Sequence, residues 1–427
     1  MSGNPFFEDW NTPFGTPPFG QIRLEHFRPA YERAFAEHAR EIAEIAANPE
    51  LPSFENTIVA LEKSGRMLSR IDLVFFNLAS SDTNDGLQSI ERDLAPLHAR
   101  HWNAIHLNPD LFRRIAAIYA QRETLSLGAE ELRVLERYRL DFQRAGANLE
   151  GDARARYAQI GERLAELGTA FGQNVLADEQ GFILPLDESD LEGLPDFARE
   201  AARGLAKERG IAAPCAVTTS RSSAEPFLQF SDRRDLREKV FKALAGRGDR
   251  ANAHDNKALI AEIVTLRAEK AKLLGYSTFA DYRLDDTMAK TPDSARILLD
   301  QVWTAARARA LEERDDLQAV VAEEGNNFPL AAWDWRYYAE KLRKTRYDFD
   351  EAEIIPYLQL DKMIAAAFDT AHRLFGLDFK ERNDLPVYHP DVRVWEVTRG
   401  SEHVGLFYGD YFARPSKRGG AWMSSFR

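Results

Sequence analysis

The densest group of potential metal ligands in this 427-residue sequence is His98, His101 and His106, in the nonapeptide HARHWNAIH. On a helix, residues three apart share a face, so His98 and His101 could supply two ligands to one zinc ion. His106 lies well round the helix from His101, and no carboxylate stands close by in sequence as a third ligand. We therefore expect surface or core histidines here rather than a metal site.

The other residue types that could catalyse a reaction or bind a metal do not provide a candidate site either. Cys215 is the only cysteine, which excludes an intrachain disulfide and a Cys/His metal cluster. Within APCAVTT it is expected to be a small buried residue of a strand. There is no G-x-S-x-G motif to support a serine hydrolase. Acidic pairs such as those in Glu312–Leu317 are typical of solvated helix faces in a chain with 68 acidic residues, so they nominate no general acid or base.

The elements that would have to position a site are mainly helices. In Leu360–Phe375, apolar residues recur at three- and four-residue steps, and Gly376 follows where a helix C-terminal glycine belongs. A further helix is predicted to begin near Trp335. The same apolar period appears around six other segments: Tyr31–Ile45, Phe54–Phe76, Leu132–Phe142, Tyr157–Phe171, Leu259–Leu274 and Ala295–Val321. The prediction is a large, mainly α fold, with an N-terminal helical region (1–150) and a second helical region with small β elements (151–427).

Strand signals are few and gather toward the end of the chain. Gly181–Leu186 and Pro226–Phe230 are short apolar runs that we predict to pair as a small sheet. Val392–Thr398 nearly alternates β-branched and aromatic residues with polar ones. A short turn and then His403–Phe412 follow, which predicts a hairpin.

Charge and composition exclude some partners. The formal net charge is −12, whereas nonspecific binding to nucleic acid or an anionic membrane requires a basic surface. No apolar run approaches the roughly 18 residues of a membrane span. The N-terminus also lacks a basic stretch followed by an apolar run, which a secretory signal would have. We expect a cytoplasmic protein with no nucleic-acid or membrane partner.

Two long stretches of the sequence, WDWRYYAEKLRKTRYDFDEAEIIPYLQLDKM and LPSFENTIVALEKSG, are similar to segments of a known family. They resemble the central signature and the N-terminal segment, respectively, of the thimet oligopeptidase and oligopeptidase family of zinc peptidases. LPVYHPDVRVWEV, FYGDYFARPSK and GGAWM resemble the hairpin and loop that precede its active site. FYGDYFAR and VYHPDVRVWE lean toward the bacterial peptidyl-dipeptidases, with oligopeptidase A next. The resemblance runs from residue 1 to residue 427 and implies a helical zincin-type architecture, here incomplete.

The resemblance implies hydrolysis of short unstructured peptides by a zinc enzyme. A His-Glu-x-x-His helix would supply two zinc ligands and a general base. In this sequence no histidine is followed by glutamate. We therefore expect no catalytic residue and no metal ligand in this chain, and we expect zinc only in a complete protein. The chain is interpreted as the front part of a longer peptidase that favours release of C-terminal dipeptides, and is predicted to be inactive alone.

The loop at the end of the chain is the candidate substrate contact. Gly419 and Gly420 lack Cβ atoms, so a peptide backbone could approach closely, and Trp422 could wall a side-chain pocket. Ala421, which lies between Gly420 and Trp422, is included in the candidate substrate-binding set. Alternatively, the glycines only make the turn and Trp422 is a core residue. The basic pair Lys417-Arg418 could attract a substrate carboxylate or be solvated loop charges.

Two other functions stay open at this level. The chain could be a non-catalytic helical peptide-binding or scaffold protein derived from the family. It could also be one chain of a two-chain peptidase, completed by a separate polypeptide. A large bare apolar face would count against a stand-alone scaffold, since such faces promote aggregation.

Overall fold

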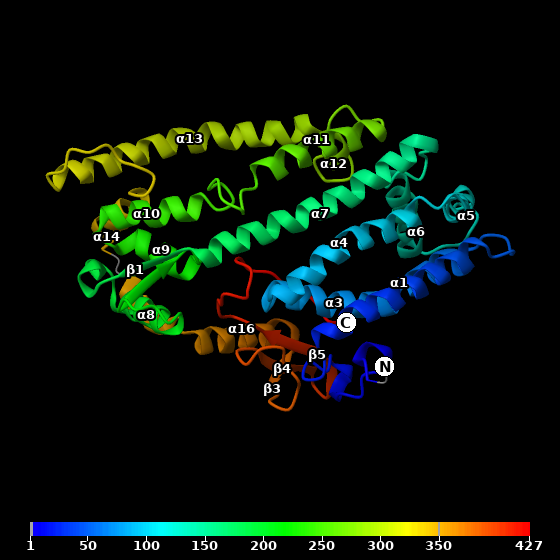
Figure 1. Ribbon diagram of the computed structural model, residues 1–427, viewed down its shortest axis with the longest axis horizontal. Coiled ribbons are helices and arrows are strands. Elements are labelled where there is room, and N and C mark those ends of the chain that lie inside the picture. The colour runs from blue at the N-terminus through cyan, green and yellow to red at the C-terminus, as the bar shows by residue number, and fades with distance from the viewer. Residues whose placement is uncertain (1–2, 349–350) are drawn as a thin grey trace.

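The computed structural model describes residues 3–348 and 351–427, so Phe349 and Asp350 of the signature segment lie outside the described residues. The fold is mainly α, as predicted, with two small antiparallel sheets. Figure 1 shows an elongated molecule in which α7 runs through the middle and α4 lies alongside it. The first helices are α1 (Leu24–Ala46), α2 (Ala60–Lys63), α3 (Arg66–Ser81), α4 (Asp85–His106), α5 (Pro109–Ala120), α6 (Ala129–Arg144) and α7 (Gly151–Gly181).

The remaining helices follow α7 in the chain, and α11 packs along the first half of α7. α13 forms one edge of the molecule as a long rod (Figure 1). The helices are α8 (Asp196–Glu208), α9 (Arg221–Phe230), α10 (Arg234–Ala245), α11 (Lys257–Leu273), α12 (Phe279–Leu284), α13 (Pro292–Glu323), α14 (Trp335–Tyr347), α15 (Glu351–Ile354) and α16 (Leu360–Phe375). Gly376 ends α16 with φ +65°, the left-handed conformation expected of a terminal glycine.

The helical period predicted over Phe54–Phe76 is interrupted in the structure. A π-helical turn at Phe54–Val59 leads into the short α2, and α3 begins anew at Arg66. Gly65 separates them with φ +68°, and a Cβ there would lie 2.9 Å from the His38 ring. A residue with a side chain would suffer both backbone strain and this collision, so the break depends on glycine.

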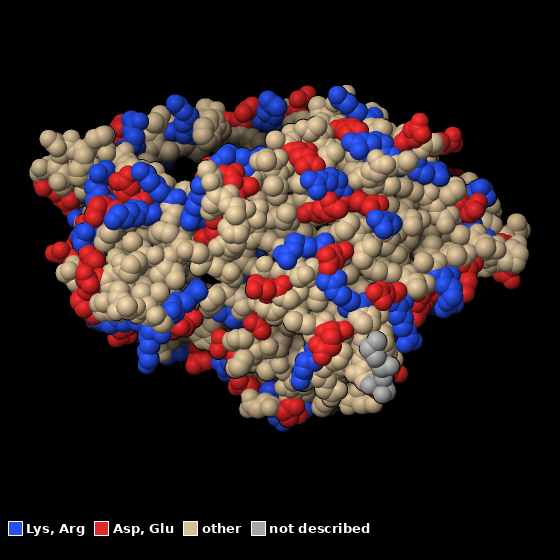
Figure 2. All heavy atoms as spheres, in the orientation of Figure 1, with Lys and Arg blue, Asp and Glu red and all other residues tan. Residues whose placement is uncertain are grey.

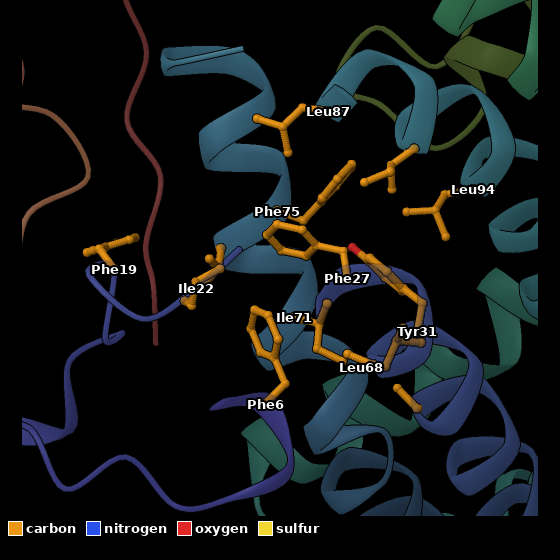
Figure 3. Close-up of a cluster of buried hydrophobic side chains, with 14 residues drawn as sticks. Phe6, Phe19, Ile22, Phe27, Tyr31, Leu68, Ile71, Phe75, Leu87 and Leu94 are labelled. Carbon is orange, nitrogen blue, oxygen red and sulfur yellow. The ribbon is translucent and has the colours of Figure 1, made fainter. Parts of the chain in front are cut away.

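The largest buried cluster lies in the N-terminal helices. Figure 3 shows aromatic rings from the N-terminal segment, α1 and α3 meeting at its centre. Phe27 packs edge-on against Phe75 with ring centroids 5.1 Å apart, and Tyr31 against Phe75 at 5.7 Å. Such edge-to-face pairs stabilise a core beyond the burial of their surface. This core contains residues of both α3 and α4 and so flanks the loop that joins them.

One strand prediction was wrong. β1 (Ile183–Leu186) pairs antiparallel with β2 (Cys215–Thr218), whereas Pro226–Phe230 is the second half of α9. A five-residue apolar run is compatible with a strand or with a helix. Ala224, which belongs to the same buried helix face, lies just outside the run. Ala224, Phe227 and Leu228 are all buried, at the three- and four-residue spacing of a helix face. Cys215 is a buried strand residue, as predicted.

The predicted hairpin is confirmed and gains a third strand. β4 (Arg393–Arg399) pairs with β5 (Glu402–Gly409), and β3 (Asp378–Glu381) pairs with the other side of β4. Apolar residues of the sheet pack on α16, where Phe368 stacks on Phe379 at 3.9 Å and meets Trp395 edge-on at 5.3 Å. β5 is one of the two edge strands, with β3 at the other edge, and leads directly into the C-terminal loop.

Candidate functional site

The candidate site is a groove of about 910 Å³ between α7, α8, α9 and the C-terminal loop. Its walls come from the end of α7, from α8, from α9 and the segment that joins β2 to it, and from residues 411–421. These segments are far apart in sequence, and the red C-terminal segment lies beside the green elements in Figure 1. Apolar side chains such as Phe197, Phe230 and Phe412 line it together with charged and hydroxyl groups. This mixture is typical of ligand sites.

Asp410 organises the loop that forms one wall. Its carboxylate accepts two hydrogen bonds from Arg414, at 2.8 and 2.7 Å, and one from the Tyr388 hydroxyl at 2.8 Å. Lys417 Nζ lies 3.1 Å from the same carboxylate and donates to the Phe412 carbonyl at 3.1 Å. Burial alone would raise the pKa of Asp410, but the hydrogen bonds from Arg414 and Tyr388 lower it to about 2. The Lys417 ammonium group is therefore bound by groups of the loop and stabilises the conformation of the loop.

The same loop is fastened to the helical base between α3 and α4. Thr83 N donates to the Ser416 carbonyl at 2.8 Å, and Arg418 N donates to the Ser80 carbonyl at 2.9 Å. Arg414 Nε also donates to the Ser81 carbonyl at 2.9 Å. These bonds join segments more than 330 residues apart, so the position of the loop depends on the N-terminal core.

The structure brings three of the four predicted contact residues to the groove. Gly419, Gly420 and Ala421 line it, whereas Trp422 lies outside the lining. A Cβ at Gly419 would lie 3.2 Å from Glu179 Oε1 on α7, and Gly420 has φ +116°. Both positions thus favour glycine, one for a close approach and one for its backbone conformation. Trp422 is half-buried beneath the Arg418 guanidinium, 5.1 Å from the ring centroid.

Several charges of the groove are neutralised within the chain. Glu179 pairs with Arg247 at 3.1 Å, and Glu225 pairs with Arg221 at 3.1 Å. Sequence reasoning missed Glu179 and the wall around α9. One signal was present for α9, because the serines of SRSSAEP are residues that commonly begin helices. Nothing in the local sequence links the α7 glutamate to the loop.

The histidines do not form a metal centre. His38 Nδ1 and His101 Nε2 lie 2.9 Å apart, so the two nitrogens share a hydrogen bond instead of facing a common ion. His38 Nε2 lies 3.2 Å from Ser64 Oγ, and His98 Nε2 lies 3.2 Å from Asp72 Oδ1. Within residues 3–348 and 351–427, no three His, Cys, Asp or Glu residues are grouped so as to hold a metal ion. The described residues thus do not fit a zinc site.

The buried His38–His101 pair should make folding sensitive to acid. Burial and the neighbouring His38 and His98 lower the pKa of His101 from 6.5 to about 4. Between these values the unfolded chain binds a proton that the folded chain does not, so the free energy of unfolding falls as the pH falls from about 6.5 toward 4. From pH 7 to pH 5 we expect His101 to account for a loss of about 2 kcal/mol.

Urea unfolding of the native chain and of His101→Gln at both pH values measures this difference. The native chain should lose about 2 kcal/mol more than the variant between pH 7 and pH 5. Equal losses in the two proteins would contradict the assignment to His101. Acid-sensitive carboxylates common to both proteins cancel in the comparison.

The comparisons with known proteins match this chain to peptidases. Residues 227–427 match peptidase family M3. A dipeptidyl carboxypeptidase of Escherichia coli K12 is 38% identical over 426 residues, covering 99% of this chain and 63% of that protein. An oligopeptidase A of Haemophilus influenzae is 30% identical over 415 residues, covering 96% of this chain and 61% of that protein.

The chain spans 63% of the length of the two dipeptidyl carboxypeptidases that it matches. Among the described residues, no helix has the length and apolar character needed to cross a membrane. Residues 411–421, which bound the groove on one side, fall within the matched range, whereas the start of α9 at Arg221 lies before it. Residues 227–427 are thus similar to peptidase family M3, and nearly the whole chain is similar to a dipeptidyl carboxypeptidase and to an oligopeptidase A.

Proposed function

We propose that this chain forms the peptide-binding part of a peptidase that cleaves short unstructured peptides, with release of C-terminal dipeptides favoured. The groove that contains Gly419–Ala421 carries this proposal, because its volume of about 910 Å³ accommodates an extended peptide of a few residues. The activities for which two of the relatives are named, dipeptidyl carboxypeptidase and oligopeptidase A, support the reaction class. A cytoplasmic location stays a prediction.

We propose further that zinc and its ligands belong to polypeptide outside these 427 residues. The family implies a zinc-bound water as the nucleophile, and the sequence contains no His-Glu pair that could hold and activate it. What this chain contributes to the reaction is binding: the loop and α7–α9 hold the peptide and exclude water from its apolar side chains. The 427-residue chain alone is then inactive.

An uncovered apolar face supports the proposal that this chain binds the peptide while further polypeptide holds the zinc. It argues against a stand-alone scaffold protein. On the first half of α13, Leu298, Leu299, Val302 and Trp303 are 60–67% exposed and lie on one face of the helix. α16 leaves Phe375 62% exposed. Figure 2 shows acidic and basic residues intermixed on the visible face, with no extended basic patch there. We propose that the remaining polypeptide of the peptidase packs on these apolar faces, as a continuation or as a second chain.

Peptide binding to the purified 427-residue chain tests the proposal. Ala421→Trp should fill the groove and weaken binding of a short peptide about tenfold or more, measured by isothermal titration calorimetry. Met423→Trp is the matched control, because Met423 is 91% exposed and lies outside the groove. It should leave the affinity unchanged.

Two results would contradict the proposal. Equal affinity for Ala421→Trp and Met423→Trp would remove the groove as the binding site. Dipeptide release by the 427-residue chain that zinc stimulates and a chelator abolishes would place catalysis within it. A stable, monodisperse chain that binds peptide and shows no tendency to aggregate would favour the scaffold function instead.

A further inference from the structure

A second pocket, of about 340 Å³, lies among the N-terminal helices and shares no lining residue with the groove. One wall is the end of α1 and the residues just after it, where Glu41 and Asn48 lie two helical turns apart. The facing wall is the π-helical turn Phe54–Val59 with α2, which ends at Lys63. π-helical turns are rare and are frequently found at functional sites. We call this space the α1–α2 pocket.

Two charged side chains of the α1–α2 pocket lack a counter-ion. Glu44 is neutralised by Arg40, 2.6 Å away. The Glu41 carboxylate accepts a hydrogen bond from the Gly65 N–H at 2.8 Å but forms no ion pair among the described residues. Lys63 lines the same pocket and, in the part of the chain that the structure describes, pairs with no carboxylate, Glu41 included. The pocket thus presents one negative and one positive group that do not neutralise each other.

A buried cation behind the same pocket also lacks a counter-ion. Arg114 of α5 is only 7% exposed, and its guanidinium donates to neutral oxygens. Two of these acceptors belong to residues that line the pocket: the Asn48 carbonyl, at 2.8 Å, and Asn56 Oδ1, at 2.9 Å. Burying a cation without an anion costs stability, and its field is poorly screened where water is excluded. An anion bound beside Asn48 and Asn56 would offset that cost.

The distribution of charge selects the kind of ligand. A simple cation would be attracted by Glu41 but repelled by Lys63 and Arg114, and a simple anion would meet the reverse. A small molecule that carries both charges satisfies both walls at once. Its ammonium group pairs with Glu41 on α1, and its carboxylate pairs with Lys63 on the wall that Arg114 supports. Ile45 and Ala60 provide apolar surface in the same pocket for the carbon atoms of such a ligand.

We propose that the α1–α2 pocket binds a small zwitterion with a free amino group and a free carboxylate, either an amino acid or a dipeptide. Both ligands present the same two charged groups and differ in the distance between them. The pocket is separate from the groove, so this inference goes beyond the proposed function. A dipeptide in the pocket would be a product of the proposed reaction held at a second site.

Titration of the 427-residue chain with four ligands, followed by saturation-transfer difference NMR, tests the proposal. The ligands are alanine, alanyl-alanine, N-acetyl-alanyl-alanine and alanyl-alanine amide. Alanyl-alanine should bind about fivefold more tightly than either blocked form, the upper range for one accessible charge pair. If alanine binds as tightly as alanyl-alanine, the ligand is an amino acid. If alanine binds several-fold more weakly, the ligand is a dipeptide.

Two variants assign the two charges of the ligand. Lys63→Gln should remove the preference for the free carboxylate over the amide. Glu41→Gln should remove the preference for the free amine over the acetylated form, and its side-chain oxygen can still accept from the Gly65 N–H. Glu37→Gln is the control on the same helix, and Lys272→Gln is the control for an exposed lysine, because neither residue lines the pocket. Both controls should bind as the native chain does.

The groove is tested as a competing location with Ala421→Trp, which should leave the affinity for the ligand unchanged. A loss of binding in Ala421→Trp would place the ligand in the groove and overturn this inference. Equal binding of the blocked and unblocked forms, or no binding of any form, would also overturn it. So would preferences that persist in both Lys63→Gln and Glu41→Gln. None of these results decides the proposed function, which is measured with longer peptides at the groove.

Discussion

Replacing Asp334 by Asn is expected to lower the free energy of unfolding by about 3–5 kcal/mol, the usual cost of breaking a buried ion pair. The Asp334 carboxylate is completely buried and lies 2.9 Å from the equally buried Arg237 guanidinium. Arg234 donates to it at 2.8 Å and Ala331 N at 3.0 Å. Asparagine has nearly the same shape, but its charge is gone and its NH₂ group faces arginine donors. Arg237 would then be a buried cation without a counter-ion.

The substitution should also affect the groove. The ion pair joins α10 to the start of α14, and both helices pack against α9, which lines the groove. Arg237 also donates to the Ser231 carbonyl, at 2.7 Å, just after the end of α9. We therefore expect weaker peptide binding in Asp334→Asn even under conditions in which the chain remains folded. Urea unfolding followed by circular dichroism measures the stability, and calorimetry measures the binding.

Asp369→Asn is the control for this prediction. Asp369 pairs with Arg373 at 2.9 Å, but both side chains are more than half exposed. Exposed pairs of this kind contribute about 0.2–1 kcal/mol. If Asp334→Asn cost no more than Asp369→Asn, the buried pair would not hold this part of the fold together.

The second large effect is expected at Asp410, the residue that organises the groove loop. Asp410→Asn removes the charge that holds Arg414, whose side chain is only 7% exposed, and Lys417. Losing charge-assisted hydrogen bonds should raise the population of the opened loop about 10- to 100-fold. Limited proteolysis with trypsin reports this directly, since Lys417 and Arg418 lie in the loop. Cleavage there should accelerate by a similar factor, and peptide binding should weaken.

Asp384→Asn is the matched control for the loop. Asp384 pairs with Arg382 at 2.8 Å near the same sheet, but its side chain is 58% exposed. Its cleavage rate should stay close to that of the native chain. A cleavage rate for Asp410→Asn equal to that of Asp384→Asn would show that the backbone bonds to the α3–α4 loop hold residues 411–421 without Asp410.

The local spacing of apolar residues was sufficient to predict a helix or strand that buries one of its own faces. The apolar steps of Leu360–Phe375 and the alternation in Val392–Thr398 predicted α16 and β4, because each segment buries one face and its spacing records that face. Pro226–Phe230 was misassigned because five residues are too few to separate the two periods. The ion pair between Asp334 and Arg237 could not be predicted from the sequence. Each is an ordinary charged residue near the start of a helix, and only the tertiary structure buries both.

The sequence by itself determined the mainly helical class, the C-terminal hairpin, the absence of a His-Glu motif and the resemblance to a peptidase family. The tertiary structure alone decided which residues meet. The groove unites residues near 179, 209 and 221 with residue 420, and no local pattern encodes contacts between the C-terminal loop and elements about 200 positions before it. Whether Gly420 faces a ligand groove or a simple turn depends on the α7–α9 wall beside it.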